Sequence, residues 1–518
     1  MAIEISALAD IVRIHGAERP NTPAIVYEGC TTSYGALDRA SSRVANALIA
    51  EGVRPQARVA HLDKSTDLFF ELLFGIAKAA AVIVSVNWRL AAPEIAHIVN
   101  DAEAEILFVG EAYFPVIEKI RSELRTVRKV VAFGRHPAWE SFEPWRDRQP
   151  ATDPNLPSRP SDTAVQFYTS GTTGLPKGAE LTNRNFGALL PTWTEAWLQA
   201  PGVPNLVCLP MFHIGGAGWG IAGLFGGATN HVMRDFVPAQ ILDTIQRERL
   251  QVMLLVPAMI LFLVQAPQIR ETDLSSLRLI VYGASPIPAE LLKQVMTIFP
   301  CGFQQVYGLT ETTGAITLLP PDDHDPNDAR KLLSCGYAQK GVELRIVGDD
   351  GKDRPAGQVG EIAVRSRQIM AGYWKLPEAT ARAIQGDWFF TGDAGYLDDS
   401  GYLYIYDRVK DMIVSGGENI YPAEVESALF GHPAVADVAV IGVPDERWGE
   451  AVKAVVVKKA GAEVTPGELI GWARERIAGY KLPKSIDFID ALPRNPTGKI
   501  LKRQLRKAYW GDRERQVS

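Results

Sequence analysis

The sequence predicts an α/β protein with a large N-terminal part of layered α/β subdomains, a small β-barrel-like subdomain and a small mobile α+β domain. Up to about residue 300, helix-like segments alternate with short β-rich runs, which is typical of parallel sheets covered by helices. From Gly336, short strands are divided by Gly-Asp and Asp-Gly turns, which indicate an antiparallel sheet or barrel. From about Asp411, a last unit mixes helices and strands and ends in a Lys/Arg-rich tail. Its size suits a separate domain.

The elements of the N-terminal part follow from apolar periodicity and β-branched runs. Helices are expected at 34–51, from 183 onward, at 238–249 and at 289–298, and strands at 58–62, 81–86, 106–109, 129–133, 163–168, 206–211, 252–256 and 279–282. The proline-rich connection 144–160 predicts a subdomain joint. In the later parts, strands are expected at 343–347, 361–365, 435–443 and 453–458, and helices at 422–430 and 466–476.

Composition limits the classes of function. The chain has 518 residues, of which 47% are hydrophobic, and a net charge of −6, so it can bury large cores and has no basic field for nucleic acid. Its four cysteines, Cys30, Cys208, Cys301 and Cys335, are widely spaced. We therefore expect small buried side chains in a reducing cytoplasm, without a zinc site or disulfides.

No segment has the pattern of a signal peptide or a spanning helix. The longest stretch without Asp, Glu, Lys or Arg lies between Glu195 and Arg234, and prolines and glycines interrupt it, so a buried pocket wall is expected there. A cytoplasmic homodimer without an integral membrane segment is expected, and peripheral membrane contact stays open.

The strongest motif is the stretch from Tyr168 to Gly178, Tyr-Thr-Ser-Gly-Thr-Thr-Gly-Leu-Pro-Lys-Gly. Glycines let backbone N–H groups turn toward an anion, hydroxyls add neutral donors and Lys177 adds a positive charge. A strand is expected before it and a helix after it, which is where nucleotide loops usually lie. The pattern differs from a Walker A loop because Gly178, not Ser or Thr, follows Lys177. A Gly/Ser/Thr-rich linker is the alternative.

Four further motifs narrow the chemistry. The segment Gln305–Glu311 offers an aromatic face at Tyr307 and a carboxylate at Glu311 for Mg²⁺. Thr391-Gly392-Asp393 places a carboxylate on a tight turn, suited to ribose hydroxyls. Tyr406–Asp411 and Pro493–Lys499 add cations late in the chain. Taken singly, each of these has a plain structural explanation as a turn, a hairpin or a solvated tail.

Together and in this order, the motifs resemble those of the adenylate-forming superfamily, which includes acyl-CoA synthetases, peptide-synthetase adenylation domains and beetle luciferases. The resemblance covers about residues 6–506. It implies that a carboxylate attacks the α-phosphate of ATP to give an acyl-adenylate and pyrophosphate, and that a thiol then displaces AMP. It also implies an N-terminal domain of residues 1–409 and a rotating C-terminal domain of residues 410–518, with the hinge at Lys410.

The matching positions imply an ATP site, with Lys177, Thr310, Glu311 and Lys499 as catalytic residues. Thr169, Ser170, Gly171, Thr172, Thr173, Gly174 and Lys177 would hold the β- and γ-phosphates, Gly283, Ala284 and Ser285 would line the adenine and acyl pocket, and Gln305, Val306, Tyr307 and Gly308 would bracket the adenine. Thr310 would touch the α-phosphate, Glu311 would bind Mg²⁺, Asp393 and Arg408 would bind the ribose, and Lys499 would contact the carboxylate and α-phosphate. Charge that develops at the α-phosphorus needs a positioned cation and a metal rather than a covalent nucleophile.

The acid is expected to be hydrophobic and uncharged apart from its carboxylate. His213 resembles a gate residue at the acyl pocket, although a satisfied core histidine is the alternative. Gly215 and Gly216 are expected to leave room beside it for a medium or long acyl chain or an arylalkanoic acid. Tyr282 and Gly283 complete the expected substrate residues. The segments expected to line the pocket, 213–220, 282–285 and 312–319, contain no Asp that could hold the amino group of an amino acid.

The expected acceptor is coenzyme A. Ser415, Gly416 and Gly417 match the segment that lines the pantetheine tunnel in CoA-using relatives, and Arg234 is a candidate contact for the CoA phosphates. An aryl- or phenylpropanoid-acid CoA ligase and an enzyme that loads a carrier protein remain alternatives. A nucleotide-binding module without catalysis is disfavoured because the charged residues of all the motifs are present.

Overall fold

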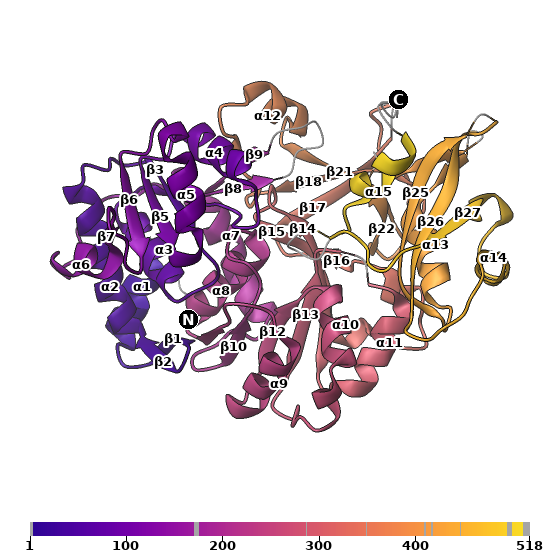
Figure 1. Cartoon of the computed structure of the whole chain (residues 1–518), viewed down its shortest axis with the longest axis horizontal. Coiled ribbons are helices and arrows are strands. Elements are labelled where there is room, and N and C mark those ends of the chain that lie inside the picture. The colour runs from indigo at the N-terminus through magenta and orange to yellow at the C-terminus, as the bar shows by residue number, and fades with distance from the viewer. Residues whose placement is uncertain are drawn as a thin grey trace.

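The computed structural model describes residues 4–169, 176–285, 287–348, 350–408, 411–415, 418–445, 447–494 and 500–510. Within these ranges the strands form four sheets (Figure 1). The first two are mainly parallel, the third is antiparallel and the fourth belongs to the C-terminal unit. The expected mixed α/β class is therefore confirmed.

The first sheet lies at the centre of the molecule and is parallel from β1 to β14 along its strand order. Its strands, in spatial order, are β16 (Tyr337–Ala338), β15 (Gly314–Leu319), β14 (Gly302–Leu309), β13 (Leu279–Gly283), β12 (Val252–Leu255), β10 (Pro204–Val207), β11 (Thr229–Val232), β1 (Pro23–Tyr27) and β2 (Cys30–Ser33). The carboxyl ends of β13 and β14 carry the segments expected to bind nucleotide, which is where ligands bind in open α/β sheets.

The second sheet joins segments on both sides of the proline-rich connection. Its strands, in spatial order, are β19 (Gly372–Tyr373), β9 (Lys177–Thr182), β8 (Thr163–Thr169), β4 (Val82–Ser85), β3 (Arg58–Leu62), β5 (Ile106–Gly110), β6 (Lys129–Phe133) and β7 (Glu140–Ser141). Since β8 pairs directly with β4, residues 144–160 connect two parts of one sheet. The expectation of a subdomain joint there is wrong.

Helices fill the space between the first two sheets and cover their outer faces (Figure 1). The helices of the large N-terminal part are α1 (Ala9–Glu18), α2 (Tyr34–Ala50), α3 (Leu68–Lys78), α4 (Ala92–Asp101), α5 (Phe114–Ile120), α6 (Phe142–Asp147), α7 (Asn183–Ala196), α8 (Ile214–Gly226), α9 (Pro238–Arg247), α10 (Pro257–Gln265), α11 (Ala289–Ile298) and α12 (Pro377–Ala383). Residues of α2, α3, α7 and α8 share one buried core with both sheets.

Local chemistry explains where several helices begin. The hydroxyl of Ser33 caps α2 by accepting from the backbone N–H of Ala36 at 3.2 Å. Thr182 and Asn185 cap each other's backbone N–H groups at the start of α7. Proline occupies the first turn of α9 and α10, where its missing N–H costs nothing.

The third and fourth sheets follow in the order the sequence predicts. The third consists of β17 (Val342–Val347), β18 (Gly360–Ser366), β20 (Ile384–Gln385), β21 (Trp388–Leu397) and β22 (Leu403–Arg408), and the fourth of β23 (Ile413–Ser415), β24 (Glu418–Ile420), β25 (Val435–Asp445), β26 (Gly449–Lys458) and β27 (Ser485–Phe488). Helices α13 (Pro422–Phe430), α14 (Pro466–Arg474) and α15 (Lys502–Trp510) accompany the fourth sheet, which forms a distinct unit at one end of the molecule (Figure 1).

Two details differ from the expectations. The strand expected at 206–211 is β10, Pro204–Val207, because the chain leaves the sheet before Pro210 and turns into α8. Cys30 is exposed, whereas Cys208 and Cys335 are buried and Cys301 is half-buried, so the expectation of four buried cysteines is wrong for Cys30. All four are free thiols, as expected, and burial raises the pKa of Cys208, Cys301 and Cys335 to about 12.

A buried ammonium group helps to hold residues 148–162, which connect α6 with β8, against the helices. Lys78 of α3 is fully buried, and its Nζ donates to the backbone oxygen of Asp38 and to Ser42 Oγ, both at 2.8 Å. The same Nζ lies 3.3 Å from Asp153 Oδ2 in the connection. Arg13 of α1 also donates to both oxygens of Asp153, at 2.9 and 3.0 Å. The carboxylate of Asp153 therefore binds cations from two helices.

Asp153→Asn should lower the free energy of unfolding by about 1 kcal/mol at pH 7. Burial raises the pKa of Asp153, but the hydrogen bond from Arg13 and the charge of Lys78 outweigh it and lower the pKa from 3.8 to about 2. A depressed pKa contributes stability above 3.8 that is lost as the pH falls to about 2. Denaturant unfolding of both proteins across this range should show the difference shrinking. Asp243→Asn, on an exposed ion pair with Arg247, is the control; an equal effect there would contradict the prediction.

Candidate active site

The expected phosphate loop connects two antiparallel strands. Thr169 at the end of β8 lies directly opposite Lys177 at the start of β9, so the two strands form a hairpin, which we call the phosphate hairpin. The expected placement between a strand and a helix is wrong, because β9 precedes α7. The hairpin nevertheless brings a hydroxyl and an ammonium group to the same end of two paired strands.

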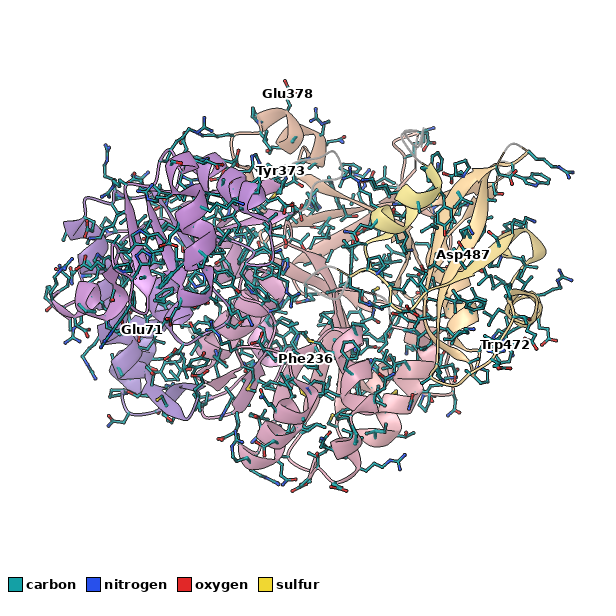
Figure 2. The ribbon with its side chains drawn as sticks, viewed as in Figure 1. Glu71, Phe236, Tyr373, Glu378, Trp472 and Asp487 are labelled. Atoms are coloured by element: carbon teal, nitrogen blue, oxygen red, sulfur yellow. The ribbon has the colours of Figure 1, made fainter. Side chains whose placement is uncertain are left out.

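Glu311 lies against this hairpin although 142 residues separate it from Thr169. Thr169 Oγ1 donates to Glu311 Oε1 at 3.4 Å, a long and weak hydrogen bond. The hydroxyl of Tyr373 donates to the same oxygen at 2.9 Å, and the ring of Tyr373 lies 5.0 Å from Lys177 Nζ. Figure 2 labels Tyr373 between the N-terminal helices and the third sheet. The structure thus brings together a cation, a carboxylate and two hydroxyls from four separate segments.

The turn that carries Thr310 and Glu311 is held rigidly. Thr312 Oγ1 accepts from the backbone N–H of Leu309 at 2.9 Å and donates to the backbone oxygen of Gly314 at 2.6 Å. Gly314 has a φ of +116°, which favours glycine. The glycine at 308 is also explained by packing, since a Cβ there would lie 1.9 Å from the oxygen of Gly314.

The expected adenine and ribose residues also meet. The hydroxyl of Tyr307 donates to Asp393 Oδ2 at 2.7 Å, across 86 residues. Asp393 of β21 is the backbone pairing partner of Arg408 in β22. Gln305 is buried and Nε2 donates to Cys335 Sγ at 3.6 Å, while Val306 packs on the core between the two large sheets. The aromatic residue and the carboxylate therefore form one group beside β21 of the third sheet.

The segment after β13 has a strained backbone. Ala284 has a φ of +67°, which is uncommon for a residue with a Cβ. A Cβ at Gly283 would lie 2.3 Å from the backbone oxygen of Val306, so only glycine permits the close approach of β13 to β14 there. Ser285 is described beside them and is half-buried.

Tyr282 is a core residue. Its side chain is fully buried among the helices on the outer face of the first sheet, and its hydroxyl lies 3.0 Å from His324 Nε2. His324 Nδ1 lies 2.9 Å from the backbone oxygen of Pro320. Burial lowers the pKa of His324 to about 4, so the neutral imidazole donates from Nδ1 to Pro320 and accepts from Tyr282. The expectation that Tyr282 contacts substrate is therefore wrong.

His213 begins the buried helix α8. Its Nε2 is buried without a hydrogen-bond partner among the described residues, so the alternative of a satisfied core histidine is not supported. Burial, with a smaller effect of the charge of Arg89, lowers its pKa to about 3. The imidazole is neutral at pH 7 and can offer one nitrogen to a ligand without adding charge.

Gly216 is required for helix packing. A Cβ at this position would lie 2.2 Å from the backbone oxygen of Pro210 and 2.6 Å from that of Leu209. The expectation that Gly216 leaves room for the acid is wrong, because the backbone fills that space. At Gly215 the nearest atom to a built Cβ is Leu209 Cδ1 at 3.7 Å, so Gly215 is the position that could accept a side chain.

Gly216→Ala should therefore destabilise the protein by about 2 kcal/mol or more, because a carbonyl group of the main chain cannot move aside cheaply. Gly215→Ala, one residue earlier on the same helix, should melt close to the wild-type temperature. Thermal melting of the three proteins checks the contrast. Equal melting temperatures for the two variants would mean that α8 shifts to accommodate the methyl group.

Arg234 is held in an ion pair. Its Nη2 donates to the buried carboxylate of Asp63 at 3.1 Å, and Lys64 pairs with Asp235 at 2.7 Å beside it. These two ion pairs join the ends of β3 and β11. This arrangement gives Arg234 a structural role and does not favour the expected contact with CoA phosphates.

Several expected site residues lie outside the described residues. These are Ser170, Gly171, Thr172, Thr173, Gly174, Lys410, Gly416, Gly417 and Lys499. Ser415 lies in β23, where it pairs with Glu418 and Gly449.

Sequence reasoning missed Tyr373. It lies 62 residues after Glu311 in a two-residue strand, too short to show a β pattern. The Gly372-Tyr373-Trp374 triplet carried no signal of its own, and only the pairing of β19 with β9 brings Tyr373 to the site.

Comparison with known proteins identifies the family. The profile of the AMP-binding enzyme family matches residues 12–374, and that of the C-terminal domain of AMP-binding enzymes matches residues 424–499. The chain therefore belongs to the AMP-binding enzyme family, within the adenylate-forming superfamily, as its motifs indicate.

Three similar proteins span almost the whole chain. A fatty acid–[acyl-carrier-protein] ligase of Streptomyces coeruleorubidus is 41% identical over an alignment of 520 positions, which covers 99% of each chain. A long-chain-fatty-acid–CoA ligase of Mycobacterium tuberculosis is 38% identical over 480 residues, which are 92% of this chain and 93% of that one. The crystal structure of the anthranilate CoA ligase AuaEII in complex with anthranoyl-AMP superposes with a TM-score of 0.91 and 29% identity, over 98% of both chains.

These findings confirm the expected class, an AMP-forming acid–thiol ligase, and the use of ATP and CoA by the family. No helix in the described ranges has the length and apolarity needed to cross a membrane.

Proposed function

We propose that the protein is an ATP-dependent acyl-CoA synthetase that activates a hydrophobic carboxylic acid, most simply a medium- or long-chain fatty acid. The convergence of Thr169, Lys177 and Glu311 carries this proposal, because it assembles phosphate-binding groups beside a carboxylate. The group formed by Tyr307 and Asp393 supports it by offering an aromatic face and a ribose acceptor.

The first half-reaction is the attack of a carboxylate oxygen on the α-phosphorus of ATP. The bond from that phosphorus to the bridging oxygen breaks, and pyrophosphate leaves with the electron pair. Lys177 would neutralise the β- and γ-phosphates, and Thr310 would donate to the α-phosphate. In the second half-reaction a thiolate attacks the acyl carbonyl carbon and AMP leaves. The catalytic contribution is positioning and electrostatic stabilisation.

Mg²⁺ fits the donor set at the phosphate hairpin. Within the described part of the chain, no cluster of three or more His, Cys, Asp or Glu side chains could hold a metal ion alone. Mg²⁺ in nucleotide sites is usually bound by one or two carboxylates together with phosphates and water, and Glu311 supplies such a carboxylate. When bound, the ion would neutralise charge that develops on the phosphates.

The nature of the acid follows from His213 and Gly215. A neutral imidazole with a buried Nε2 and an open glycine position favour an uncharged, hydrophobic acyl group. An aryl or phenylpropanoid acid is the alternative, and the structural similarity to the anthranilate CoA ligase supports it.

A carrier protein is the alternative acceptor. The observation that favours it is the 41% identity, over 99% of both chains, to a fatty acid–[acyl-carrier-protein] ligase. CoA remains the primary proposal, because Ser415–Gly417 match the segment that lines the pantetheine tunnel in CoA-using relatives. We also propose an N-terminal domain of residues 1–409, a mobile C-terminal domain from the hinge at Lys410, a cytoplasmic location and a homodimer.

Two assays test the function. ATP–pyrophosphate exchange with a panel of fatty, aryl and amino acids should show exchange with hydrophobic acids only. AMP release should then depend on free CoA. Release that requires a purified acyl carrier protein instead would establish the alternative acceptor, and no acid-dependent exchange at all would reject the adenylating function.

A further inference from the structure

Residues Gln368–Trp374, which we call the bridging segment, connect the phosphate hairpin with the turn that carries Glu311. On the hairpin side, Gly372 and Tyr373 pair with Glu180 and Ala179 of β9. The backbone N–H of Trp374 donates to the oxygen of Gly178 at 2.7 Å, one residue after Lys177. The end of the bridging segment, β19, is thus an added strand at the edge of the hairpin.

On its other side, the bridging segment holds the turn of Glu311. The backbone N–H of Met370 donates to the backbone oxygen of Glu311 at 2.8 Å. The amide of Gln368, which is 4% exposed, donates to the backbone oxygens of Thr312 and Ala315 at 2.9 and 2.8 Å. The hydroxyl of Thr313 donates back to the oxygen of Gln368 at 2.6 Å. Four hydrogen bonds therefore fix this turn to the same segment that pairs with the hairpin.

The side chain of Tyr373 makes a second connection, directly between the charged side chains of Glu311 and Lys177. Its hydroxyl donates to Glu311 Oε1 at 2.9 Å, and the face of its ring lies 5.0 Å from Lys177 Nζ. A cation near an aromatic face is attracted to it, and a carboxylate that accepts a hydrogen bond is restricted in orientation. One side chain thus contacts both the expected phosphate ligand and the expected metal ligand.

We propose that Tyr373 is a positioning residue, whose hydroxyl orients the carboxylate of Glu311 toward the metal ion of Mg·ATP and whose ring places the Lys177 ammonium. This inference rests on the proposed function, because it assumes that Glu311 meets Mg²⁺. Groups that orient a metal ligand typically change metal affinity 10- to 100-fold when they are removed.

Binding of ATP to the full chain, measured by calorimetry with Mg²⁺ and with EDTA, tests the proposal without turnover. Tyr373→Phe keeps the ring beneath Lys177 and removes the hydroxyl. It should reduce the advantage that Mg²⁺ gives to ATP binding by about tenfold and leave binding of metal-free ATP unchanged. Tyr373→Leu removes the ring as well and should also weaken binding of metal-free ATP.

Tyr402→Phe is the matched control, because Tyr402 also donates to a carboxylate, Asp323 Oδ2 at 2.7 Å, on another part of the surface. It should change neither affinity. In a Glu311→Gln background, Tyr373→Phe should cause no further loss of the Mg²⁺ advantage, because the charged group that Tyr373 orients toward the metal ion has gone.

Three results would overturn the proposal: an intact Mg²⁺ advantage in Tyr373→Phe, an equal loss with and without Mg²⁺, and additive losses in the double variant. The wild-type protein separates this inference from the function on which it rests. A wild type without acid-dependent exchange and without a Mg²⁺ advantage would reject the proposed function, and the role of Tyr373 with it.

Discussion

Glu311→Gln should slow acyl-adenylate formation by about a hundredfold to a thousandfold. It removes a negative charge that is expected to stabilise the transition state by roughly 3–4 kcal/mol. The substitution conserves shape, and the amide oxygen can still accept from Tyr373, so the turn held by Met370 and Gln368 should remain folded. The loss should therefore appear in the chemistry of the first half-reaction rather than in the melting temperature.

Single-turnover formation of the acyl-adenylate from ATP and the preferred acid measures this effect. Thioester formation from supplied acyl-adenylate should be nearly unchanged, because the bond between the α-phosphorus and pyrophosphate is already broken in that compound. Glu343→Gln, which removes a surface carboxylate paired with Arg365 on the third sheet, is the control. A wild-type rate for Glu311→Gln would remove Glu311 from the proposed site.

Lys499→Ala should lower acyl-adenylate formation by about two to three decades, because the resemblance gives this lysine an electrostatic contact of roughly 3–4 kcal/mol with the carboxylate and α-phosphate. Lys499 lies outside the described residues, so this prediction depends on its motif. If the C-terminal domain rotates between the steps, thioester formation from supplied acyl-adenylate should be almost unaffected.

Both half-reactions must be measured on one preparation, with a melting curve beside them. Lys502→Ala is the matched control: this lysine is three positions later, and its Nζ lies 3.0 Å from Glu426 within the C-terminal unit. Comparable losses in both half-reactions would mean that Lys499 is structural or that the domain does not alternate.

Much of the fold could be predicted because its signals are local. The helices Ala289–Ile298 and Pro422–Phe430 and the strands Arg58–Leu62 and Lys129–Phe133 occur at the expected residues, since apolar periodicity and a proline or turn at each boundary act over a few positions. The strand Lys177–Thr182 was not predicted, because its first two residues were assigned to the phosphate loop.

The candidate site was predicted only as separate motifs. Thr169, Lys177, Tyr307, Glu311 and Asp393 were singled out because each lies in a segment rich in glycine, hydroxyl or aromatic residues. That Tyr307 donates to Asp393, and that Glu311 accepts from Thr169, are contacts across 86 and 142 residues. No local sequence pattern specifies contacts between residues so far apart in the chain.

The sequence by itself determined the family, the order of most elements and the charged residues proposed to meet the nucleotide, because motifs and periodicity are properties of neighbouring residues. Only the tertiary structure showed what surrounds Tyr373, Gly216 and Tyr282. Tyr373 reaches Glu311 through a two-residue strand, Gly216 faces the main chain of Pro210, and Tyr282 points into a core toward His324. The physical reason is the same in each case: a side chain's function depends on what the packing of distant segments places beside it, and the identity of the residue does not contain that information.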